Sequence, residues 1–412
     1  MKNTIKQLID NVKIRENKNN NFLHLTVNEN QISKTANSFL GSKISERYYF
    51  GGGEDGVVDF YPFTFVGMPE VENLINSAST ALKKMSGGSV VNMDFLSGLH
   101  AMMSAILSTT EPGDTVMTVN PKDGGHFATT GILKHFGRKH IFASYDMATL
   151  QFDAEATAKT FKKNKAKMFY IEASNYVNPH NLKEIRKKLG KDAIIIYDAS
   201  HTLGLILGGQ FQNPFKEGAD IITANTHKTL AGPQKGLIII KDKKLGEKMQ
   251  SKIIGTLYSS NHVANLIALA ITILEWEKYG KKYAVDVIKN AQALSAEFEK
   301  LGYEVRKANN KTYTKNEQVH LFIKDENKRL EWARNLTKNN ISTNLHSSPG
   351  KRIFARIGTQ EITRRGMKLV DMKTVALLFH EAASGKNIKN KVKKFNSKFK
   401  TIKYSFDQDL KI

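Results

Sequence analysis

The sequence predicts an α/β protein with a mostly parallel sheet in a large domain, followed by a smaller α+β domain. Between residues 115 and 240, short apolar runs alternate with stretches of helical spacing. Alternation of this kind builds a parallel sheet that helices cover on both faces. After Met249 the pattern changes to long helical stretches and a few short strands, which is typical of an α+β domain.

The expected elements follow the chain in order. The N-terminal part is expected to contain a helix over 4–16, a glycine-rich loop over 37–56 and helices over 68–85 and 96–107. The strands expected to form the sheet are 115–119, 139–143, 168–173, 193–197, 221–223 and 237–240, with helices after 124 and over 154–163 and 181–189. The C-terminal elements are expected to be helices 262–279, 283–301, 330–339 and 371–384 and strands 303–306, 318–323 and 352–357.

The composition indicates a globular chain with a large excess of positive charge. The 412 residues include 62 Lys and Arg against 39 Asp and Glu, which gives a net charge of +23. Such an excess marks either an anionic partner (nucleic acid, a phosphorylated cofactor or an acidic substrate) or a solvated lysine-rich surface. The second interpretation is favoured because the lysines are scattered along the chain and are concentrated only in the tail 386–403.

The composition also disfavours several classes of protein. The chain has no cysteine, which excludes disulfides, thiolate metal sites and cysteine nucleophiles and fits a reducing cytoplasm. The first residues lack the apolar run of a secretory signal, and the apolar stretch 263–276 is too short to span a bilayer. We therefore expect a soluble, cytoplasmic protein with no metal site and no nucleic-acid or membrane partner.

A polar loop between two apolar strands carries Lys228. Burial and neighbouring positive charge lower the pKa of a lysine, so that its free amine can attack a carbonyl group. Lys228 is therefore a candidate Schiff-base lysine, although a plain surface lysine is the alternative in a chain so rich in them. Ser174, Asp198 and His201 fall at the expected carboxyl ends of strands, where α/β proteins bind their ligands.

Asp198 and Lys228, thirty residues apart, form the arrangement that a pyridoxal phosphate site requires. A carboxylate keeps the pyridine nitrogen of this cofactor protonated, and a lysine binds its aldehyde. For Asp198 alone, a helix N-cap after a strand is an equally good interpretation. The pair favours the cofactor site.

These residues resemble the signature of the serine hydroxymethyltransferase family, whose members are fold-type-I pyridoxal phosphate enzymes. The segments Tyr197-Asp-Ala-Ser-His-Thr-Leu-Gly-Leu and Thr223-Ala-Asn-Thr-His-Lys-Thr-Leu-Ala-Gly-Pro carry the resemblance. It runs from about residue 22 to 385 and also includes Arg47 to Tyr49, Ser97 and Gly98, Glu111 to Val116, Gly124 to His126, Asn213 and Pro214, Arg356 to Thr359 and Ile362 to Gly366. It implies a mostly parallel seven-stranded sheet in the large domain and a homodimer.

The resemblance also implies roles for residues of this chain. Lys228 would bind the cofactor as an aldimine, Asp198 would pair with the ring nitrogen and His126 would stack on the ring. The further residues implied in catalysis are His201, Thr226 and Tyr49. The further residues implied in cofactor binding are Ser97, Gly98, Ser174, His201, His227 and Ser260.

Substrate binding is implied for Asn28, Tyr48, Tyr49 and Arg356. Arg356 would take the substrate carboxylate, which suits the planar fork of a guanidinium group. Without the Ile-Gly-Thr that follows it, a strand-end surface arginine would be the better interpretation. Tyr48 and Tyr49 would reach the site of the neighbouring subunit, which places the sites at the subunit interface.

Several positions depart from the family pattern, mainly where the family binds folate. The family has a glutamate, just before its Tyr-Tyr pair, that handles protons during hydroxymethyl transfer, and Gly41 stands in its place. The other departures are Leu99 at the second phosphate serine, Tyr258 to Asn261 in place of a glycine-rich segment, Gln234 at an arginine, Pro121 and Thr130 in the pterin region, and a shortened loop over 346–352. We therefore expect intact cofactor chemistry and lost folate binding.

The expected function is cleavage or formation of the Cα–Cβ bond of a β-hydroxy amino acid, through a glycine quinonoid and without folate. The enzyme would be an aldolase, a transaldolase or hydroxymethyltransferase-like, and would act in amino acid metabolism. The alternatives are a tetrahydrofolate-dependent serine hydroxymethyltransferase, an aminotransferase on the same fold, and a basic nucleic-acid-binding protein that kept only the scaffold. Lys235, Lys351 and Arg352 near the motif loops are better interpreted as solvated surface charges, and the alternative is that they favour an anionic aldehyde.

The expected domain boundaries follow from the same comparison. Residues 1–52 would form an N-terminal arm and a dimer-contacting loop, and 53–275 the large domain that binds pyridoxal phosphate. Residues 276–385 would form the small C-terminal domain, and 386–412 a basic extension.

Overall fold

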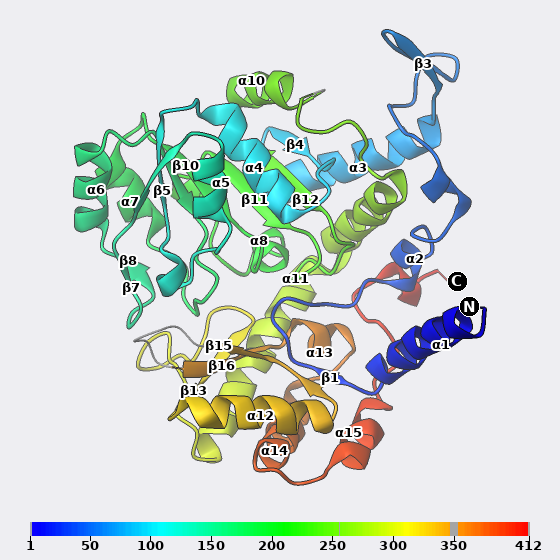
Figure 1. Ribbon diagram of the computed structural model, residues 1–412, viewed down its shortest axis with the longest axis vertical. Helices are drawn as coiled ribbons and strands as arrows, with labels where there is room; N and C mark the ends of the chain where they lie inside the picture. The colour runs from blue at the N-terminus through cyan, green and yellow to red at the C-terminus, as the bar shows by residue number, and fades with distance from the viewer. Residues whose placement is uncertain (1, 255, 347–352, 411–412) are drawn as a thin grey trace. The chain divides into compact units, whose positions relative to one another are not determined.

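The computed structural model describes residues 2–254, 256–346 and 353–410 (Figure 1). The chain divides into two compact units. The first unit consists of Met1–Val27 and Asp286–Lys403, and the second of Asn28–Val285 and Tyr404–Ile412. Each is described by itself.

The second unit contains a seven-stranded sheet, as the sequence predicts (Figure 1). The strands, in spatial order, are β4 (Val90–Asn92), β12 (Gly236–Ile240), β11 (Ile221–Asn225), β10 (Ile194–Asp198), β9 (Met168–Ile171), β5 (Thr115–Thr118) and β6 (Lys139–Phe142). Only β12 runs antiparallel to its neighbours among these strands. The predicted α/β fold with a mostly parallel sheet is therefore confirmed.

The central strands are mostly apolar and buried because helices cover both faces of the sheet. All four residues of β9 and all five of β12 are buried. Tyr197 of β10 pairs with Ile171 of β9, and Asp198 pairs with Thr223 of β11. The residues that leave these three strands therefore meet at one edge of the sheet, where the candidate site forms.

Short helices and small ribbons connect these strands. The helices of the second unit before residue 254 are α2 (Lys34–Asn37), η1 (Lys43–Glu46), α3 (Pro69–Ser86), α4 (Gly98–Thr109), η2 (Pro121–Asp123), α5 (Thr129–His135), α6 (Ala154–Lys163), α7 (Leu182–Leu189), α8 (Leu203–Leu207), α9 (Pro214–Glu217) and α10 (Lys243–Ile253). The ribbons are β2 (Val57–Phe60) with β3 (Phe63–Val66), and β7 (Tyr145–Asp146) with β8 (Gln151–Phe152). A last turn, η4 (Phe406–Gln408), returns to this unit.

A single long helix, α11 (Val263–Lys300), replaces the two helices expected over 262–279 and 283–301. The predicted break falls near Gly280, and the structure shows why a glycine there does not end the helix. A Cβ at Gly280 would overlap with the Trp276 ring, and the indole Nε1 of Trp276 donates a 3.0 Å hydrogen bond to the Gly204 carbonyl. The glycine serves close packing of helix α11.

The first unit is a smaller α+β structure. Its elements are α1 (Lys2–Asn19), β1 (Leu23–His24), β13 (Gln318–Ile323), α12 (Glu326–Lys338), β14 (Ile341–Ser342), β15 (Asn344–His346), β16 (Ile353–Gly358), α13 (Gln360–Arg364), η3 (Leu369–Asp371), α14 (Met372–Ala383) and α15 (Lys389–Asn396). Strands β13, β16 and β15 form an antiparallel sheet, and β1 pairs with β14 in parallel. The strand expected over 303–306 is reduced to an isolated bridge between Val305 and Leu321.

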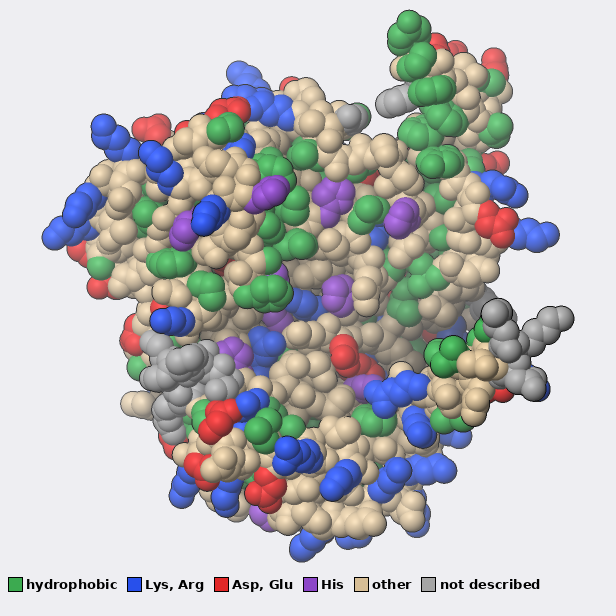
Figure 2. All heavy atoms as spheres, viewed as in Figure 1, with side chains coloured by type: hydrophobic (Ala, Val, Ile, Leu, Met, Phe, Trp, Pro, Cys, Tyr) green, Lys and Arg blue, Asp and Glu red, His purple; other side chains and the backbone are tan. Residues whose placement is uncertain are grey.

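Two surface features complete the description. The β2–β3 hairpin, which is absent from the predicted elements, stands off from the rest of the second unit (Figure 1) and carries hydrophobic side chains (Figure 2). Lysine and arginine side chains are scattered over the face that Figure 2 shows, as expected for a solvated basic surface. No helix among the described residues is long and apolar enough to cross a membrane.

Candidate active site

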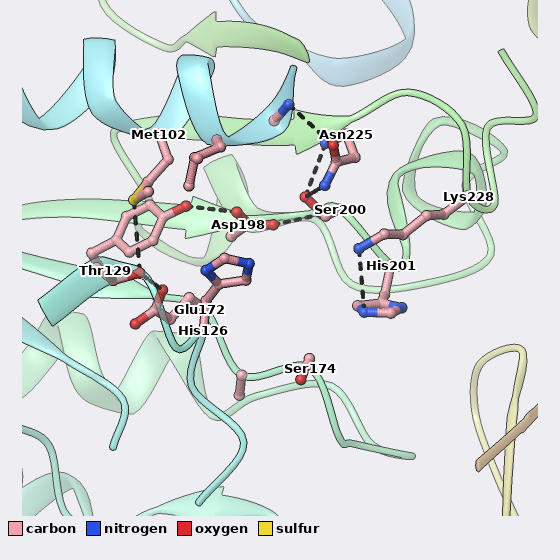
Figure 3. Close-up of a pocket in the computed structure, with 14 residues that line it drawn as sticks. Met102, His126, Thr129, Glu172, Ser174, Asp198, Ser200, His201, Asn225 and Lys228 are labelled. Carbon is pink, nitrogen blue, oxygen red and sulfur yellow. Dashed lines mark hydrogen bonds between the residues drawn. The ribbon is translucent and has the colours of Figure 1, made fainter. Parts of the chain in front are cut away.

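A pocket in the second unit lies at the carboxyl ends of β9, β10 and β11 (Figure 3). Its lining residues are Gly98, Leu99, Met102, His126, Thr129, Tyr170, Glu172, Ala173, Ser174, Asp198, Ser200, His201, Asn225 and Lys228. Six predicted site residues therefore line one pocket: Gly98, His126, Ser174, Asp198, His201 and Lys228. They come from five separate loops, which the parallel topology brings to one edge of the sheet.

Asp198 ends strand β10, and both of its carboxylate oxygens are held. Oδ2 accepts a 2.6 Å hydrogen bond from the Tyr170 hydroxyl of the neighbouring strand β9. Oδ1 accepts a 2.8 Å hydrogen bond from the backbone N–H of Ser200. The carboxylate is thus fixed in orientation by its own strand end and by a neighbouring strand.

Lys228 lies in a loop that several hydrogen bonds hold in place. Its Nζ lies 3.4 Å from Nε2 of His201, and its carbonyl accepts a 2.7 Å hydrogen bond from Nδ2 of Asn30. The hydroxyl of Thr229 donates a 2.6 Å hydrogen bond to the His201 carbonyl, which ties the two loops together. Thr226 is fully buried and its hydroxyl donates to the Lys235 carbonyl at 3.0 Å, closing the base of the loop.

His126 reaches the pocket from the turn after η2. Gly125 has to be a glycine there, because a Cβ at this position would overlap with the Val119 carbonyl. Burial lowers the pKa of His126, the Asp198 carboxylate opposes this shift, and the Lys228 ammonium adds to it. His126 is therefore neutral at pH 7, which suits a ring that stacks rather than one that carries charge. Burial also lowers the pKa of His227, to about 4.

The beginning of helix α4 adjoins the pocket. Ser97 is the N-cap, and its Oγ accepts a 3.1 Å hydrogen bond from the backbone N–H of His100. The backbone N–H of Gly98 donates to Oδ1 of Asn225 at 3.0 Å, and a Cβ at Gly98 would overlap with the Asn225 side chain. This helix N-terminus has the partial positive charge that favours a phosphate.

The other predicted site residues lie away from this pocket or in the first unit. Tyr48 is 65% exposed and, together with Ser260, lines another cavity of the second unit. Tyr49 is half-buried, and burial together with the nearby Glu72 and Asp94 carboxylates raises its pKa to about 12. The roles predicted for Tyr48, Tyr49 and Ser260 stay predictions.

Asn28 and Arg356 are the remaining two predicted residues. Asn28 is exposed at the start of the second unit. Arg356 is a buried residue of β16 in the first unit, where burial lowers its pKa to about 10 and the Glu317 carboxylate opposes the shift. Their roles in substrate binding stay predictions.

The interpretation of Lys235 as a group that attracts an anionic aldehyde is wrong for this structure. Lys235 is 1% exposed, and its Nζ donates to the backbone carbonyls of Asn261 at 2.7 Å and of Asp94 at 3.3 Å. Its charge ties two backbone segments together instead of facing a substrate. Lys351 and Arg352 lie outside the described residues.

The structure adds pocket residues that the sequence analysis missed, namely Met102, Thr129, Tyr170, Glu172, Ser200 and Asn225. Tyr170 and Glu172 are two residues apart at the end of β9, so that they point to the same side. A polar residue that alternates with apolar ones at the end of a buried strand is the signal that could have identified both. Asn225 ends β11 and could have been found in the same way.

The donor set fits pyridoxal phosphate. It offers an amine at Lys228, a fixed carboxylate at Asp198, a neutral imidazole at His126 and a helix N-terminus at Gly98. These are the groups that the aldehyde, the ring nitrogen, the ring face and the phosphate of this cofactor need. In Figure 3, Lys228 and His201 lie toward one side of the pocket, and Glu172 and Thr129 lie toward the opposite side.

Comparisons with known proteins agree with this chemistry. Residues 1–379 match the family model described as "Serine hydroxymethyltransferase". The chain is 33% identical to fluorothreonine transaldolase of Streptantibioticus cattleyicolor over 93% of its length, and it spans 61% of that longer protein. It is 32% identical to serine hydroxymethyltransferase of Methanocella arvoryzae, covering 98% of this chain and 97% of the relative.

A solved structure is similar over the whole chain. It is the crystal structure of L-threonine transaldolase from Pseudomonas fluorescens in its internal aldimine state. The match has a TM-score of 0.90 and 26% identity, and it covers 100% of this chain and 97% of that one. The fold-type-I architecture expected from the sequence is therefore confirmed.

Proposed function

Because the chain belongs to the serine hydroxymethyltransferase family, and is therefore a pyridoxal phosphate enzyme, we propose that it is a folate-independent transaldolase. It would cleave the Cα–Cβ bond of a β-hydroxy amino acid and form a new bond between the glycine unit and a second aldehyde. The observation that carries the proposal is the pocket in which Lys228, Asp198 and His126 converge. Two of the similar proteins are named transaldolases, and one of them is named for L-threonine.

When it is bound, pyridoxal phosphate supplies an electron sink for the negative charge that develops at Cα. Asp198, held by Tyr170 and Ser200, would bind the ring nitrogen and favour its protonated form. His126, a neutral imidazole, would pack against the ring. Lys228 supplies the amine, and His201 lies within 3.4 Å of its Nζ, where it can hold or pass a proton.

Independence from folate is supported by the residues that replace the family's folate contacts. By the resemblance, Gly41 stands at the position of the proton-handling glutamate, and among the described residues nothing beyond its chain neighbours lies within 4 Å of where its Cβ would be. The chain would therefore use an aldehyde as acceptor directly.

A homodimer is supported by apolar side chains that a single chain leaves exposed. In the β2–β3 hairpin, Phe63 is 61% and Val66 78% exposed, and Tyr61 at the turn is 93% exposed. A two-stranded ribbon of this kind is marginally stable by itself in water, so a second copy of the chain would cover it. Tyr48, which stacks on Phe50 at the base of the hairpin, would then face the neighbouring subunit.

The test is to incubate the cofactor-loaded protein with L-threonine and a panel of aldehydes. Acetaldehyde release is followed with an alcohol dehydrogenase, and the new β-hydroxy amino acid is identified by mass spectrometry. We expect product without any added tetrahydrofolate. Lys228→Ala should abolish product formation and the visible absorbance of the bound cofactor, whereas Lys216→Ala, at an exposed lysine of α9, should change neither.

The alternatives give different outcomes in the same assay. Conversion of serine only when tetrahydrofolate is present would identify a serine hydroxymethyltransferase and would contradict the proposal. Accumulation of pyridoxamine phosphate would identify an aminotransferase. Absence of cofactor absorbance in the wild-type protein would support the nucleic-acid-binding alternative.

A further inference from the structure

Glu172 is a buried acidic residue of the pocket. The sequence pattern predicts no role for it, and none of the cofactor contacts proposed above involves it. It follows β9 and is 6% exposed. Its Oε2 accepts a short hydrogen bond from the Thr129 hydroxyl at the start of α5. Its Oε1 is buried and has no hydrogen-bond partner among the described residues. A buried oxygen without a hydrogen bond destabilises a folded protein and is rare in native structures, so its presence in a ligand pocket indicates a role there.

The surroundings of Glu172 favour its neutral form. Burial, with a smaller contribution from the nearby Asp198 carboxylate, raises the pKa of Glu172 to about 8, although the Thr129 hydroxyl and the backbone N–H of His126 oppose this shift. The groups that face it are Asp198 on β10, Tyr170 on β9, His126 from the turn before α5 and Thr129 at the start of α5. Glu172 is therefore protonated and neutral at pH 7.

Glu172 also holds the turn that carries His126. Thr129, which bonds to Glu172, donates its backbone N–H to the His126 carbonyl at 3.3 Å. The backbone N–H of Ala128 lies 3.3 Å from Nδ1 of His126. The side chain of Glu172 therefore fixes one end of the short segment whose other end presents the imidazole to the pocket.

We propose that Glu172 is a positioning residue of the cofactor pocket, which holds the His126–Thr129 turn through its hydrogen bond to Thr129. The role acts through His126 and involves no covalent step. It rests on the cofactor site and is independent of which aldehyde the enzyme accepts. A failure of the transaldolase assay would therefore leave it intact.

The experiment measures cofactor binding rather than turnover. Pyridoxal phosphate is titrated into the apoprotein of the wild type, Glu172→Gln and Glu172→Ala, and the visible circular dichroism of the bound cofactor reports how the ring is held. Glu172→Gln stays neutral and keeps a hydrogen-bond acceptor for Thr129, so it should bind with wild-type affinity and dichroism at pH 7. Glu172→Ala should bind about 10-fold more weakly with reduced dichroism, because it releases Thr129.

The pH dependence separates positioning from mere packing. As pH rises from 7 to 9, the visible dichroism of the wild type should change with a midpoint near 8, and Glu172→Gln should lack this transition. Thr129→Val removes the same hydrogen bond from the other side, so its effect on affinity should not add to that of Glu172→Ala. Wild-type affinity and dichroism in Glu172→Ala would overturn the proposal, as would an unchanged transition in Glu172→Gln.

Discussion

The hydroxyl of Tyr170 donates a 2.6 Å hydrogen bond to Oδ2 of Asp198 across two neighbouring parallel strands. Tyr170 is fully buried, and burial together with the Asp198 and Glu172 carboxyl groups raises its pKa well above 10. The Tyr170 hydroxyl is therefore protonated at pH 7 and donates to Asp198. The orientation of the Asp198 carboxylate depends on this hydrogen bond.

Removing this donor should weaken the cofactor site without unfolding the protein. Hydrogen bonds to charged groups contribute about 1.5–3 kcal/mol, so we expect Tyr170→Phe to lower cofactor affinity by roughly 10- to 100-fold, measured by titration of the apoprotein. Tyr197→Phe is the matched control, because the Tyr197 hydroxyl donates to Gln212 and does not line the pocket. It should cost about 1 kcal/mol of stability and leave affinity unchanged. Equal losses of affinity in both variants would contradict the assignment.

The glycine at the start of α4 gives a second prediction. A Cβ in Gly98→Ala would displace the Asn225 side chain and break its 3.0 Å bond to the Gly98 N–H. Cofactor affinity should fall about 10-fold, since this bond and the close approach of the backbone are lost together. Gly131→Ala, in the middle of α5 with open space at its Cβ, should instead raise the unfolding free energy by up to about 1 kcal/mol. If Gly98→Ala binds the cofactor with unchanged affinity, the N-terminus of α4 does not take part in cofactor binding.

Glu172 should also leave a signature in the stability of the protein. The ordinary pKa of a glutamate, 4.5, applies to the unfolded chain, and the folded chain holds the proton up to about pH 8. The folded state therefore binds one more proton in this window, and its stability falls by about 1.4 kcal/mol per pH unit as pH rises through it. Chemical denaturation between pH 5 and 8 should show that the wild type loses stability relative to Glu172→Gln as the pH rises. The difference between their unfolding free energies should grow by up to about 1.4 kcal/mol per pH unit. Parallel curves would show that Glu172 is ionised.

Acid lability should come from a buried histidine. Burial lowers the pKa of His180 from 6.5 to about 3, and its ring lies among those of Tyr145, Phe152 and Tyr176. Between pH 6.5 and about pH 3, His180 is protonated in the unfolded chain and neutral in the folded chain. The free energy of unfolding therefore falls by about 1.4 kcal/mol for each pH unit by which the pH is lowered. His180→Phe should flatten this slope in denaturation curves from pH 7 to 4. His135→Phe, at an exposed histidine of α5, should leave it unchanged.

If the exposed β2–β3 hairpin forms the homodimer interface, one charged substitution in it should weaken the dimer. Val66→Lys places a charge on a side chain that is 78% exposed, which costs little in a single chain but much in a buried interface. Sedimentation analysis should show wild-type protein at twice the 46.2 kDa of one chain and a larger monomer fraction in the variant. Val370→Lys, at a valine of η3 that is 84% exposed, should keep the wild-type mass. A monomeric wild-type protein would contradict the proposed homodimer.

The sheet and much of the pocket could be predicted from the sequence because both follow from local patterns. Buried strands such as Met168–Ile171 and Gly236–Ile240 are uninterrupted apolar runs, and parallel topology brings their carboxyl ends together. The motif around Lys228 then identifies the chemistry. Asp198 and Lys228 therefore line one pocket, as expected.

The parts that could not be predicted depend on packing between distant residues. A glycine in a helical pattern indicates a break, and only the contact of Gly280 with Trp276 shows that the helix continues. Only the contacts of the Lys235 ammonium with the carbonyls of Asn261 and Asp94 show that this lysine is neither a solvated surface charge nor a group that faces a substrate. The β2–β3 hairpin, in contrast, could have been predicted, because Val57–Phe60 and Phe63–Val66 are runs of mostly β-branched and aromatic residues separated by two residues.

The continuity of α11 limits how this chain can be divided. The boundary between the two compact units falls at residues 285 and 286, inside a helix of 38 residues. A cut there would leave each fragment with a severed helix end and with unpaired backbone groups. It would also not separate the two units, because the first unit includes residues 1–27 and the second includes residues 404–412. Fragments divided at this position should therefore not fold independently.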